Sequence, residues 1–524
     1  MTAPQTHWRP SHNPWVITVV VSMAAFMEVL DTSIANVALP HIAGAMSASY
    51  DESTWVLTSY LVANAIVLPI SGWLVSVFGR KHFFMTCIFL FSASSLLCGV
   101  APSLGLLLFF RVVQGAAGGG LQPMAQAILA DTFPPQTRGL AFSLYGVTAV
   151  MAPLIGPTLG GWLTDNYTWR WIFLINIPVG ALALVLVLQV LEDPPYLSRL
   201  VRGGVTLDYI GFALLALGVG ALQVMLDKGQ QDDWFGSRFI VTLAITTAVS
   251  LSVLVLWEWF HRAPIVDVHL FKDLNFTSAN VMLLMLGAVY FSSLVMMPRF
   301  LQTLAGYTAE QAGLVLSASG IVLLAMLPIV GRLTERFEAR YLIATGWAMI
   351  AIAMLISAKR LDLGITFETA RWLRIIQAGG LPLLFVPITL VAYVGLAPEK
   401  NTAAAGLLNF MRNIGSSIGT SFVTTIIARR TQLHQVILIP HVAPDNPNFR
   451  EQLAALAQQL ADAGLGAYEA QRQAYARLYR VVLSQAETLA YVDTFWLLGI
   501  ASAVMFALSF ALRRNDPRSA GRTS

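Results

Sequence analysis

Charged residues are scarce in this chain of 524 amino acids, at 11% of the total. Soluble domains contain about 25% charged residues, so a soluble globular protein is excluded. Cysteine is rarer still, because the chain has only Cys87 and Cys98, both in one apolar run. The two cysteines are eleven residues apart on a single predicted helix, which is too far for a disulfide bond between them. We interpret both as packing residues.

Motifs for energy-coupled or metal-dependent catalysis are also absent. No Gly-x-x-x-x-Gly-Lys-Ser/Thr loop and no His-Glu-x-x-His pair occurs, and the eight histidines fall in loops, tails or at the ends of apolar runs. A primary pump needs the first motif and a zinc hydrolase of the common type needs the second. We therefore expect neither an enzyme nor a metal site. The basic isoelectric point reflects loop charge, so we expect no nucleic-acid partner.

Long apolar runs take the place of these features, since 56% of the residues are hydrophobic. Runs of about 20 residues cross a bilayer as a helix, and we predict fourteen of them in an all-α polytopic membrane protein. Lysine and arginine favour alternate loops, which places both termini in the cytoplasm. The predicted segments are a tail at 1–14, a bundle at 15–192, an inserted helix pair at 207–260, a second bundle at 276–513 and a tail at 514–524.

An internal repeat supports the two bundles. The residues Leu68-Pro69-Ile70, Gly72, Leu74 and Phe78 recur about 259 positions later as Leu327-Pro328-Ile329, Gly331, Leu333 and Phe337. Arg111-Val-Val-Gln114 is similarly echoed by Arg374-Ile-Ile-Gln377. Duplicated helix bundles with a site at their interface are typical of secondary transporters.

Two acids, Glu28 and Asp31, lie on one face of the first apolar run. Acids at bilayer depth cost about 2.5–3.5 kcal/mol on insertion scales, so they mark an internal cavity or an ion pair. Burial and a neighbouring acid favour the protonated carboxyl, whereas a cation such as Arg111 favours the ionised form. We predict a proton-coupling cluster of Glu28, Asp31 and Arg111, with Asp31→Asn abolishing transport and Glu28→Gln having a milder effect. The alternative is a static ion pair between two spans.

One hydrophilic insertion, at 431–486, interrupts the second bundle on the predicted outer side. Its apolar residues repeat at helical spacing in two stretches, which indicates an amphipathic helical hairpin. The hairpin either folds on itself over the membrane or docks another protein. The candidate docking residues are Leu453, Leu456, Leu460, Tyr468, Tyr475 and Leu478.

The stretch Leu30–Pro40, LDTSIANVALP, resembles the first-helix signature of the fourteen-span drug:proton antiporters of the major facilitator superfamily, the EmrB/QacA type. Other segments that match this family extend over nearly the whole chain: Gly72–Lys81 in the loop after span two, Arg111–Gly115, Gly156–Gly161, Trp169–Pro178 and Asn409–Asn413. The hydrophilic insertion and the segment Leu226-Asp-Lys-Gly229 look most like the EmrB branch of the family.

This resemblance implies two six-helix bundles plus two inserted helices in the bacterial inner membrane. It implies export of lipophilic drugs driven by the proton gradient, with no other cofactor. It also implies a periplasmic adaptor and, through it, an outer-membrane channel as partners. A dedicated exporter of a metabolite, fatty acid or siderophore, or a non-transporting receptor, remains the alternative.

Gating residues follow from the same resemblance. The antiporter motif corresponds to Gly156, Pro157, Gly160 and Gly161, which we expect at the seam between the bundles because small residues permit close helix approach. The loop motif retains Gly72, Gly79 and Arg80 but has Ser76 and Val77 in place of the usual Asp-Arg pair. An inner ion-pair latch is therefore expected in the second copy, at Glu335 and Arg336.

Substrate contacts are the least determined part of the prediction. Thioether and aromatic side chains suit varied lipophilic compounds, although each such residue also suits core packing. The candidates lie on spans expected to face the cavity, and Arg412 is as compatible with a fixed contact as with transport. They are Met27, Gln122, Met124, Met151, Tyr290, Met297, Phe385, Phe410 and Arg412.

Overall fold

The computed structural model describes residues 10–194, 208–261, 263–442 and 446–512, and this part contains helices but no strand. Most of the predicted amino-terminal tail and the predicted carboxy-terminal tail lie outside these residues. The helices are α1 (Pro14–Ala45), α2 (Tyr50–Phe78), α3 (Arg80–Gly99), α4 (Leu104–Thr132), α5 (Arg138–Asn166), α6 (Trp171–Leu174), α7 (Asn176–Val190), α9 (Tyr209–Lys228), η1 (Trp234–Gly236), α10 (Arg238–Phe260), η2 (Val268–Lys272), α11 (Leu274–Leu286), η3 (Gly287–Phe291), α12 (Ser292–Thr303), α13 (Ala309–Leu333), α14 (Ala339–Arg360), α15 (Phe367–Ala392), η4 (Pro398–Lys400), α16 (Asn401–Leu438), η5 (Ile439–Val442), α17 (Pro447–Asp462) and α18 (Ala467–Ser509).

Local sequence signals fix where several of these helices begin. At α1, the side chain of Asn13 accepts a hydrogen bond from the amide of Trp15, and Pro14 occupies the first turn, where a missing amide costs nothing. α2 starts with a capping box between Ser49 and Glu52. Reciprocal bonds of this kind satisfy amides that the helix itself leaves unpaired.

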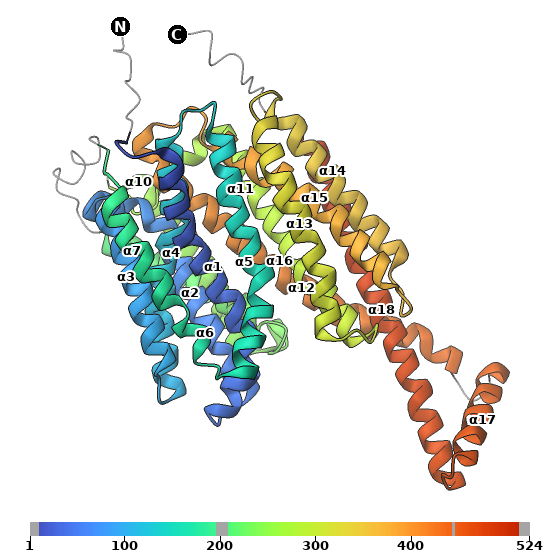
Figure 1. Cartoon of the computed structure of the whole chain (residues 1–524). Helices are drawn as coiled ribbons and strands as arrows, with labels where there is room; N and C mark the ends of the chain where they lie inside the picture. Colours follow the sequence, from blue (N-terminus) through green and yellow to red (C-terminus); the bar gives the residue numbers. More distant parts are fainter. Residues whose placement is uncertain (1–9, 195–207, 262, 443–445, 513–524) are drawn as a thin grey trace.

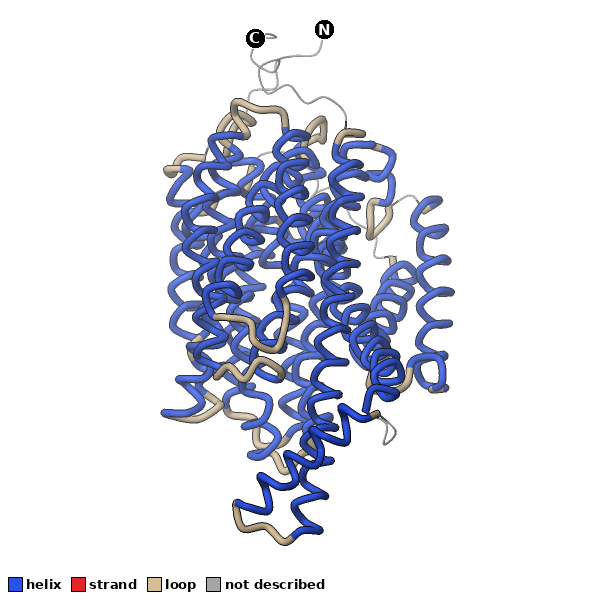
Figure 2. The backbone as a smooth tube through the Cα atoms, turned by 90° about the vertical axis from the view of Figure 1, so that its right-hand side faces the viewer, coloured by secondary structure: helices blue, strands red, loops and turns tan. Residues whose placement is uncertain are grey.

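Two helix bundles lie side by side in the molecule, with α1–α7 forming one and α11–α18 the other (Figure 1). α9 and α10 pack on each other, and α9 also contacts α2 and α16. The tube view shows the long helices running roughly parallel, with the α17–α18 hairpin projecting beyond one end (Figure 2). The start of α1 lies at the opposite end of the bundle from this hairpin (Figure 1).

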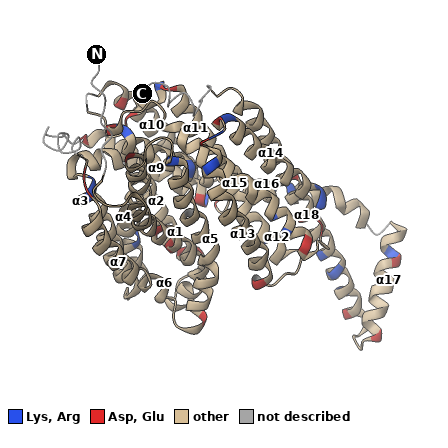
Figure 3. Ribbon diagram, turned by 45° about the horizontal axis from the view of Figure 1, so that its top comes forward, with Lys and Arg blue, Asp and Glu red and all other residues tan. Residues whose placement is uncertain are grey.

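Thirteen helical segments of the described chain are long and apolar enough to cross a membrane. α16 is not among them, although it has 38 residues and packs between α2, α4, α11 and α18. The predicted count of fourteen spans, and the predicted cytoplasmic side of the termini, therefore stay predictions. Charged residues lie mainly at helix ends and along the hairpin, and the stretches between are mostly uncharged (Figure 3).

The two bundles touch closely through small residues at the end opposite the hairpin. A Cβ atom on Gly72 of α2 would lie 2.7 Å from the Cα atom of Ala403 in α16, and one on Gly331 of α13 would lie 3.0 Å from the Cα atom of Leu140 in α5. Gly72 and Gly331 are equivalent positions of the internal repeat. The duplicated glycine therefore serves the same purpose twice, because each lets helices of opposite bundles meet at backbone distance.

Two expectations about these glycines need correction. Gly72 lies inside α2, which runs to Phe78, so the loop after the second span is reduced to Gly79. Gly79 has φ +78°, a conformation that favours glycine. Gly156 and Gly160 of the antiporter motif do not face the seam, since a Cβ on either would meet Ser33 or Ile34 of α1 in the same bundle. These two glycines pack α5 on α1 instead.

Gly72→Val is expected to reduce transport by keeping the bundles apart at this end. The added side chain overlaps backbone atoms of Ala403, and overpacking of this kind costs about 1–3 kcal/mol. Labelling of a cysteine introduced at Thr402 by a membrane-impermeant maleimide should accelerate, because Thr402 is buried when the bundles meet. Gly313→Val in α13 is the control, since no heavy atom lies within 4 Å of its Cβ position. Unchanged labelling in Gly72→Val would contradict this role for the contact.

Candidate functional site

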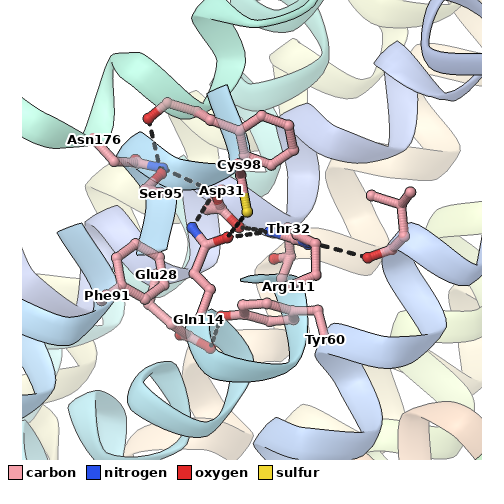
Figure 4. Close-up of polar contacts among 12 residues, drawn as sticks. Glu28, Asp31, Thr32, Tyr60, Phe91, Ser95, Cys98, Arg111, Gln114 and Asn176 are labelled. Atoms are coloured by element: carbon pink, nitrogen blue, oxygen red, sulfur yellow. Dashed lines mark hydrogen bonds and ion pairs between the residues drawn. The ribbon is translucent and has the colours of Figure 1, made fainter. Parts of the chain in front are cut away.

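Asp31 is the centre of a closed polar cluster inside the first bundle (Figure 4). Its Oδ2 atom is 2.6 Å from Nη1 of Arg111, and its Oδ1 atom accepts hydrogen bonds from Gln114 at 3.0 Å and Asn176 at 2.8 Å. The Asp31 and Arg111 side chains are 1% and 0% exposed. Both carboxylate oxygens of Asp31 are therefore already occupied by charged or amide donors.

Arg111 is held from several sides. Its Nε atom donates to the carbonyl oxygen of Val56 at 3.0 Å, and its guanidinium lies 4.3 Å from the ring centroid of Tyr60 and 5.5 Å from that of Phe173. An aromatic face attracts a cation most strongly where water is excluded. The structure therefore brings Asp31 and Arg111 together as predicted, in the form of a fixed ion pair.

Glu28 has quite different surroundings, although it lies one helical turn away on α1. Its Oε1 atom accepts hydrogen bonds from Asn64 at 3.1 Å and from the Tyr60 hydroxyl at 3.3 Å, and its Oε2 atom accepts one from Gln122. All three donors are neutral. A buried carboxyl with neutral donors can gain or lose a proton without breaking an ion pair, which makes Glu28 the more adaptable of the two acids.

Gln122 connects Glu28 to the second bundle. Its amide nitrogen donates to Glu28, and its amide oxygen accepts a hydrogen bond from Arg412 of α16. The guanidinium of Arg412 also lies 5.8 Å from the ring centroid of Phe385 on α15. One amide thus joins an acid of α1 to a cation of α16, across the interface between the bundles.

A cavity of 390 Å³ borders this connection, on its hairpin side. It is lined by Glu28 and Thr32 of α1, by Tyr60 and Asn64 of α2, by Gln122 of α4, and by Arg412 of α16. Asp31 is not part of the lining. The cavity belongs to both bundles, so a molecule bound in it would contact Glu28 and Arg412 together.

The predicted substrate residues fall into two groups. Gln122 and Arg412 line the cavity, and Phe385 contacts Arg412. Met27, Met124, Tyr290 and Met297 are almost fully buried in the hydrophobic core, while Met151 and Phe410 are partly buried. Most lining residues carry amide, hydroxyl or charged groups, and the expected thioethers pack elsewhere. Apolar side chains complete the wall: Val29, Leu61, Ala65, Pro153, Leu226 and Phe291.

The polar wall of α16 was missed by the sequence analysis, although the signal is present. Six residues of α16 lie on one helical face at intervals of three and four, and each lines the cavity: Asn413, Ser416, Ser417, Thr420, Ser421 and Thr424. This polar face also lowers the mean hydropathy of α16. It explains why a helix surrounded by other helices does not qualify as an apolar span.

The inserted helix α9 contributes to the same cavity. Gln223 and Asp227 line it, and Gln223 donates to the hydroxyl of Ser417 at 3.0 Å. Thr58 of α2 donates to the carboxylate of Asp227. Helices inserted between two bundles give no sequence signal for where they pack, so this contribution could not be inferred from the chain alone.

An ion pair does close the end opposite the hairpin, but in the first copy of the loop motif. Arg80 pairs with Asp131 at the end of α4, and Asn401 of α16 donates to the same carboxylate. Glu335 and Arg336, the expected latch, are exposed, and within the described chain neither forms an ion pair. Asp131 was overlooked because it lies some 50 positions from Arg80 and belongs to no motif.

The leucines of the α17–α18 hairpin pack against each other and against the hairpin's own residues. Leu453 and Leu460 of α17 are 8% and 6% exposed and pack with Phe449, Ala470 and Ala474, while Leu456 and Leu478 border the same cluster. Tyr468 and Tyr475 are 82% and 43% exposed. The leucines therefore close the hairpin on itself, and the tyrosines remain the accessible part of the candidate docking set.

Among the described residues, no group of three or more His, Cys, Asp or Glu side chains is placed to hold a metal ion. The arrangement that the structure does provide is a cavity-lining acid, a bridging amide and a cation around a cavity between two bundles. Such a site can bind a small molecule and exchange a proton.

Comparisons with known proteins agree with this geometry. Residues 21–420 match the family model of the Major Facilitator Superfamily. The chain is 38% identical over 482 residues to the multidrug export protein EmrB of Escherichia coli K12, covering 92% of each chain. It is 38% identical over 448 residues to the fatty acid resistance protein FarB of Neisseria gonorrhoeae, covering 85% of this chain and 87% of that protein. The solved structure of the proton:xylose symporter XylE shares the fold, with a TM-score of 0.63, 13% identity and coverage of 96% and 97%.

Proposed function

We propose that this chain, which belongs to the major facilitator superfamily and to its EmrB branch, exports lipophilic small molecules in exchange for protons. It is a multi-pass protein of the bacterial inner membrane. The observation that supports exchange most directly is the position of Glu28, which lines the cavity and is joined to Arg412 through Gln122. Multidrug export by the EmrB relatives supports drugs as the substrate class.

The proton step can be followed at named atoms. Ionised Glu28 accepts a hydrogen bond from the Gln122 amide nitrogen, which turns the Gln122 oxygen towards Arg412. Once protonated, the carboxyl becomes a donor, and its natural acceptor is that same Gln122 oxygen. Arg412 then loses its acceptor and is free to move with α16. Proton binding on α1 thereby weakens a contact with the second bundle, which is the coupling that alternating access needs.

The available energy is sufficient for export. One proton crossing about 100 mV releases about 2.3 kcal/mol, and a tenfold gradient costs about 1.4 kcal/mol. One proton can therefore sustain roughly a fortyfold gradient of a neutral compound. Exchange of one cation for one proton would move no net charge and would depend on the pH difference alone.

Substrate-dependent proton movement in proteoliposomes tests the proposal. Vesicles that contain the purified chain, an internal pH dye and an imposed pH gradient should release the gradient when a lipophilic dye such as ethidium is added. Protein-free vesicles should hold the gradient under the same conditions. A panel of lipophilic compounds without any proton movement would contradict proton-coupled export.

Export of fatty acids is the second candidate, because the FarB relative is as similar in sequence as the EmrB relative. The cation of Arg412 in the cavity wall would suit a carboxylate headgroup. Competition between a long-chain fatty acid and ethidium for proton-coupled uptake would separate a broad exporter from a dedicated one.

We further propose a periplasmic adaptor, and through it an outer-membrane channel, as partners. The hairpin carries exposed tyrosines on α18, at 82% for Tyr468, 43% for Tyr475 and 57% for Tyr479. Exposed tyrosines are enriched at protein interfaces because they offer both apolar area and a hydroxyl.

Replacing Tyr468, Tyr475 and Tyr479 by serine is expected to weaken co-purification of the adaptor and lower whole-cell resistance. Transport in vesicles of the isolated chain should stay unchanged, because the cavity lies at a distance from the hairpin. Leu453→Ser is the matched comparison, since it disrupts the hairpin's own core. It should lower the hairpin's free energy of unfolding by about 2–4 kcal/mol. Normal adaptor binding by the triple serine variant would contradict docking through these tyrosines.

A further inference from the structure

The second bundle contains a buried arginine whose charge is left without a carboxylate. Arg374 of α15 is 2% exposed, and its Nη1 atom donates to the side-chain oxygen of Gln377. Its Nε and Nη2 atoms have no hydrogen-bond acceptor. Within the described chain, no Asp or Glu forms an ion pair with it. An uncompensated buried charge is among the most costly features a protein interior can hold.

The first bundle shows what is missing. There, Arg111 donates to Gln114, and both side chains donate to the carboxylate of Asp31. The repeat relates Arg111 to Arg374 and Gln114 to Gln377 at 263 positions, and a spacing of 262 relates Asp31 to Ser293. The Arg-to-Gln bond is kept in both bundles.

Ser293 occupies the place of the acid but not its charge. Gln377 donates to the Ser293 hydroxyl as Gln114 does to Asp31. The hydroxyl proton of Ser293 is used for the carbonyl oxygen of Tyr290, at 2.6 Å. The duplicated network has therefore kept the arginine–glutamine pair and lost the anion that balanced its arginine.

We propose that a small monovalent inorganic anion of the chloride class binds beside the Arg374 guanidinium and supplies the negative charge that Asp31 supplies in the first bundle. The free N–H groups at Nε and Nη2 of Arg374 supply the donors, and the guanidinium supplies the charge. Arg374, Gln377, Ser293 and Tyr290 are each at most 4% exposed. Burial on this scale keeps the carboxylate of a lipophilic substrate away from Arg374, so the anion must be small. This site is distinct from the cavity and goes beyond the export proposed above.

Thermal unfolding of the purified full-length chain in detergent tests this site. Chloride is titrated against gluconate at constant ionic strength, because gluconate is too large for the position. A ligand that binds only the folded state raises the melting temperature in a saturable way, and we expect a rise of about 2–5 °C. Radioactive chloride should bind at one ion per chain.

Two substitutions should remove the effect in different ways. Ser293→Asp restores the acid of the first bundle, so its melting temperature should no longer respond to chloride and should match the chloride-saturated parent or exceed it. Arg374→Gln removes the charge and should also abolish the response. Ser292→Ala is the control: its neighbouring buried hydroxyl donates to the carbonyl oxygens of Ala288 and Val289 in the preceding turn, and the response should persist.

The reciprocal exchange guards against a variant that fails to fold. Asp31→Ser gives the first bundle the residues of the second, so this variant should bind a second chloride ion and show a larger chloride response than the parent. Parent protein that melts at the same temperature in chloride and gluconate would overturn the proposal. So would a Ser293→Asp variant whose chloride response equals that of Ser292→Ala.

Discussion

Glu28→Gln is expected to abolish proton-driven export while leaving substrate binding measurable. The amide cannot take up a proton, yet it keeps the size of the side chain and can still bond with Asn64, Tyr60 and Gln122. Uphill accumulation in vesicles should vanish, whereas exchange of labelled for unlabelled substrate without a gradient should continue. The exposed acid Glu310 offers the control, because Glu310→Gln should transport normally. Full uphill transport by Glu28→Gln would remove this acid from the coupling step.

Arg111→Ala is expected to give the largest loss of stability. It leaves the carboxylate of Asp31 buried without its cation, which costs about 3–5 kcal/mol, and it also removes the ring contacts with Tyr60 and Phe173. The double variant Asp31→Asn/Arg111→Ala should melt at a higher temperature than Arg111→Ala, because it removes both charges together. The four melting temperatures of a double-mutant cycle measure this coupling directly.

The behaviour of Asp31→Asn distinguishes two roles for Asp31, a structural ion-pair partner and a proton-coupling acid. If Asp31→Asn lowers stability but retains some uphill transport, the ion pair is a structural element, as its two filled oxygens indicate. An Asp31→Asn variant that is as stable as the parent and fully uncoupled would restore the prediction made from sequence, in which Asp31 was the main coupling acid.

The sequence predicted which charged residues form this cluster, but not which of the two acids pairs with Arg111. An acid pair in an apolar run and an arginine on another span suffice to predict an ion pair, because no buried charge is stable alone. Which acid takes Arg111 depends on Gln114, Asn176, Asn64 and Tyr60, which come from α4, α7 and α2. Neutral polar residues on separate helices show no spacing that links them, so their contacts appear only in three dimensions.

The fold itself was largely predictable, since apolar runs of span length and a duplicated motif determine the helices and the two bundles. The limits appear where one pattern has two physical outcomes. The leucine stripe of α17 fits a docking surface as well as a self-closing hairpin, and only the burial of Leu453 and Leu460 decides between them. In the same way, Gly156 and Gly160 indicate a close helix contact, but the sequence does not identify the neighbouring helix.

The continuity of α18 has a mechanical consequence. Its 43 residues form a rod of about 65 Å at 1.5 Å per residue, and the hydrocarbon core accounts for only about 30 Å of it. The hairpin arm is thus a rigid extension of a helix that packs in the second bundle, with no flexible joint between them. If that bundle rocks by about 10° during a cycle, an arm about 30 Å long moves its tip by about 5 Å. A protein bound to the tip would therefore be displaced in each transport cycle, outside the membrane, by a movement that starts at the centre of the membrane.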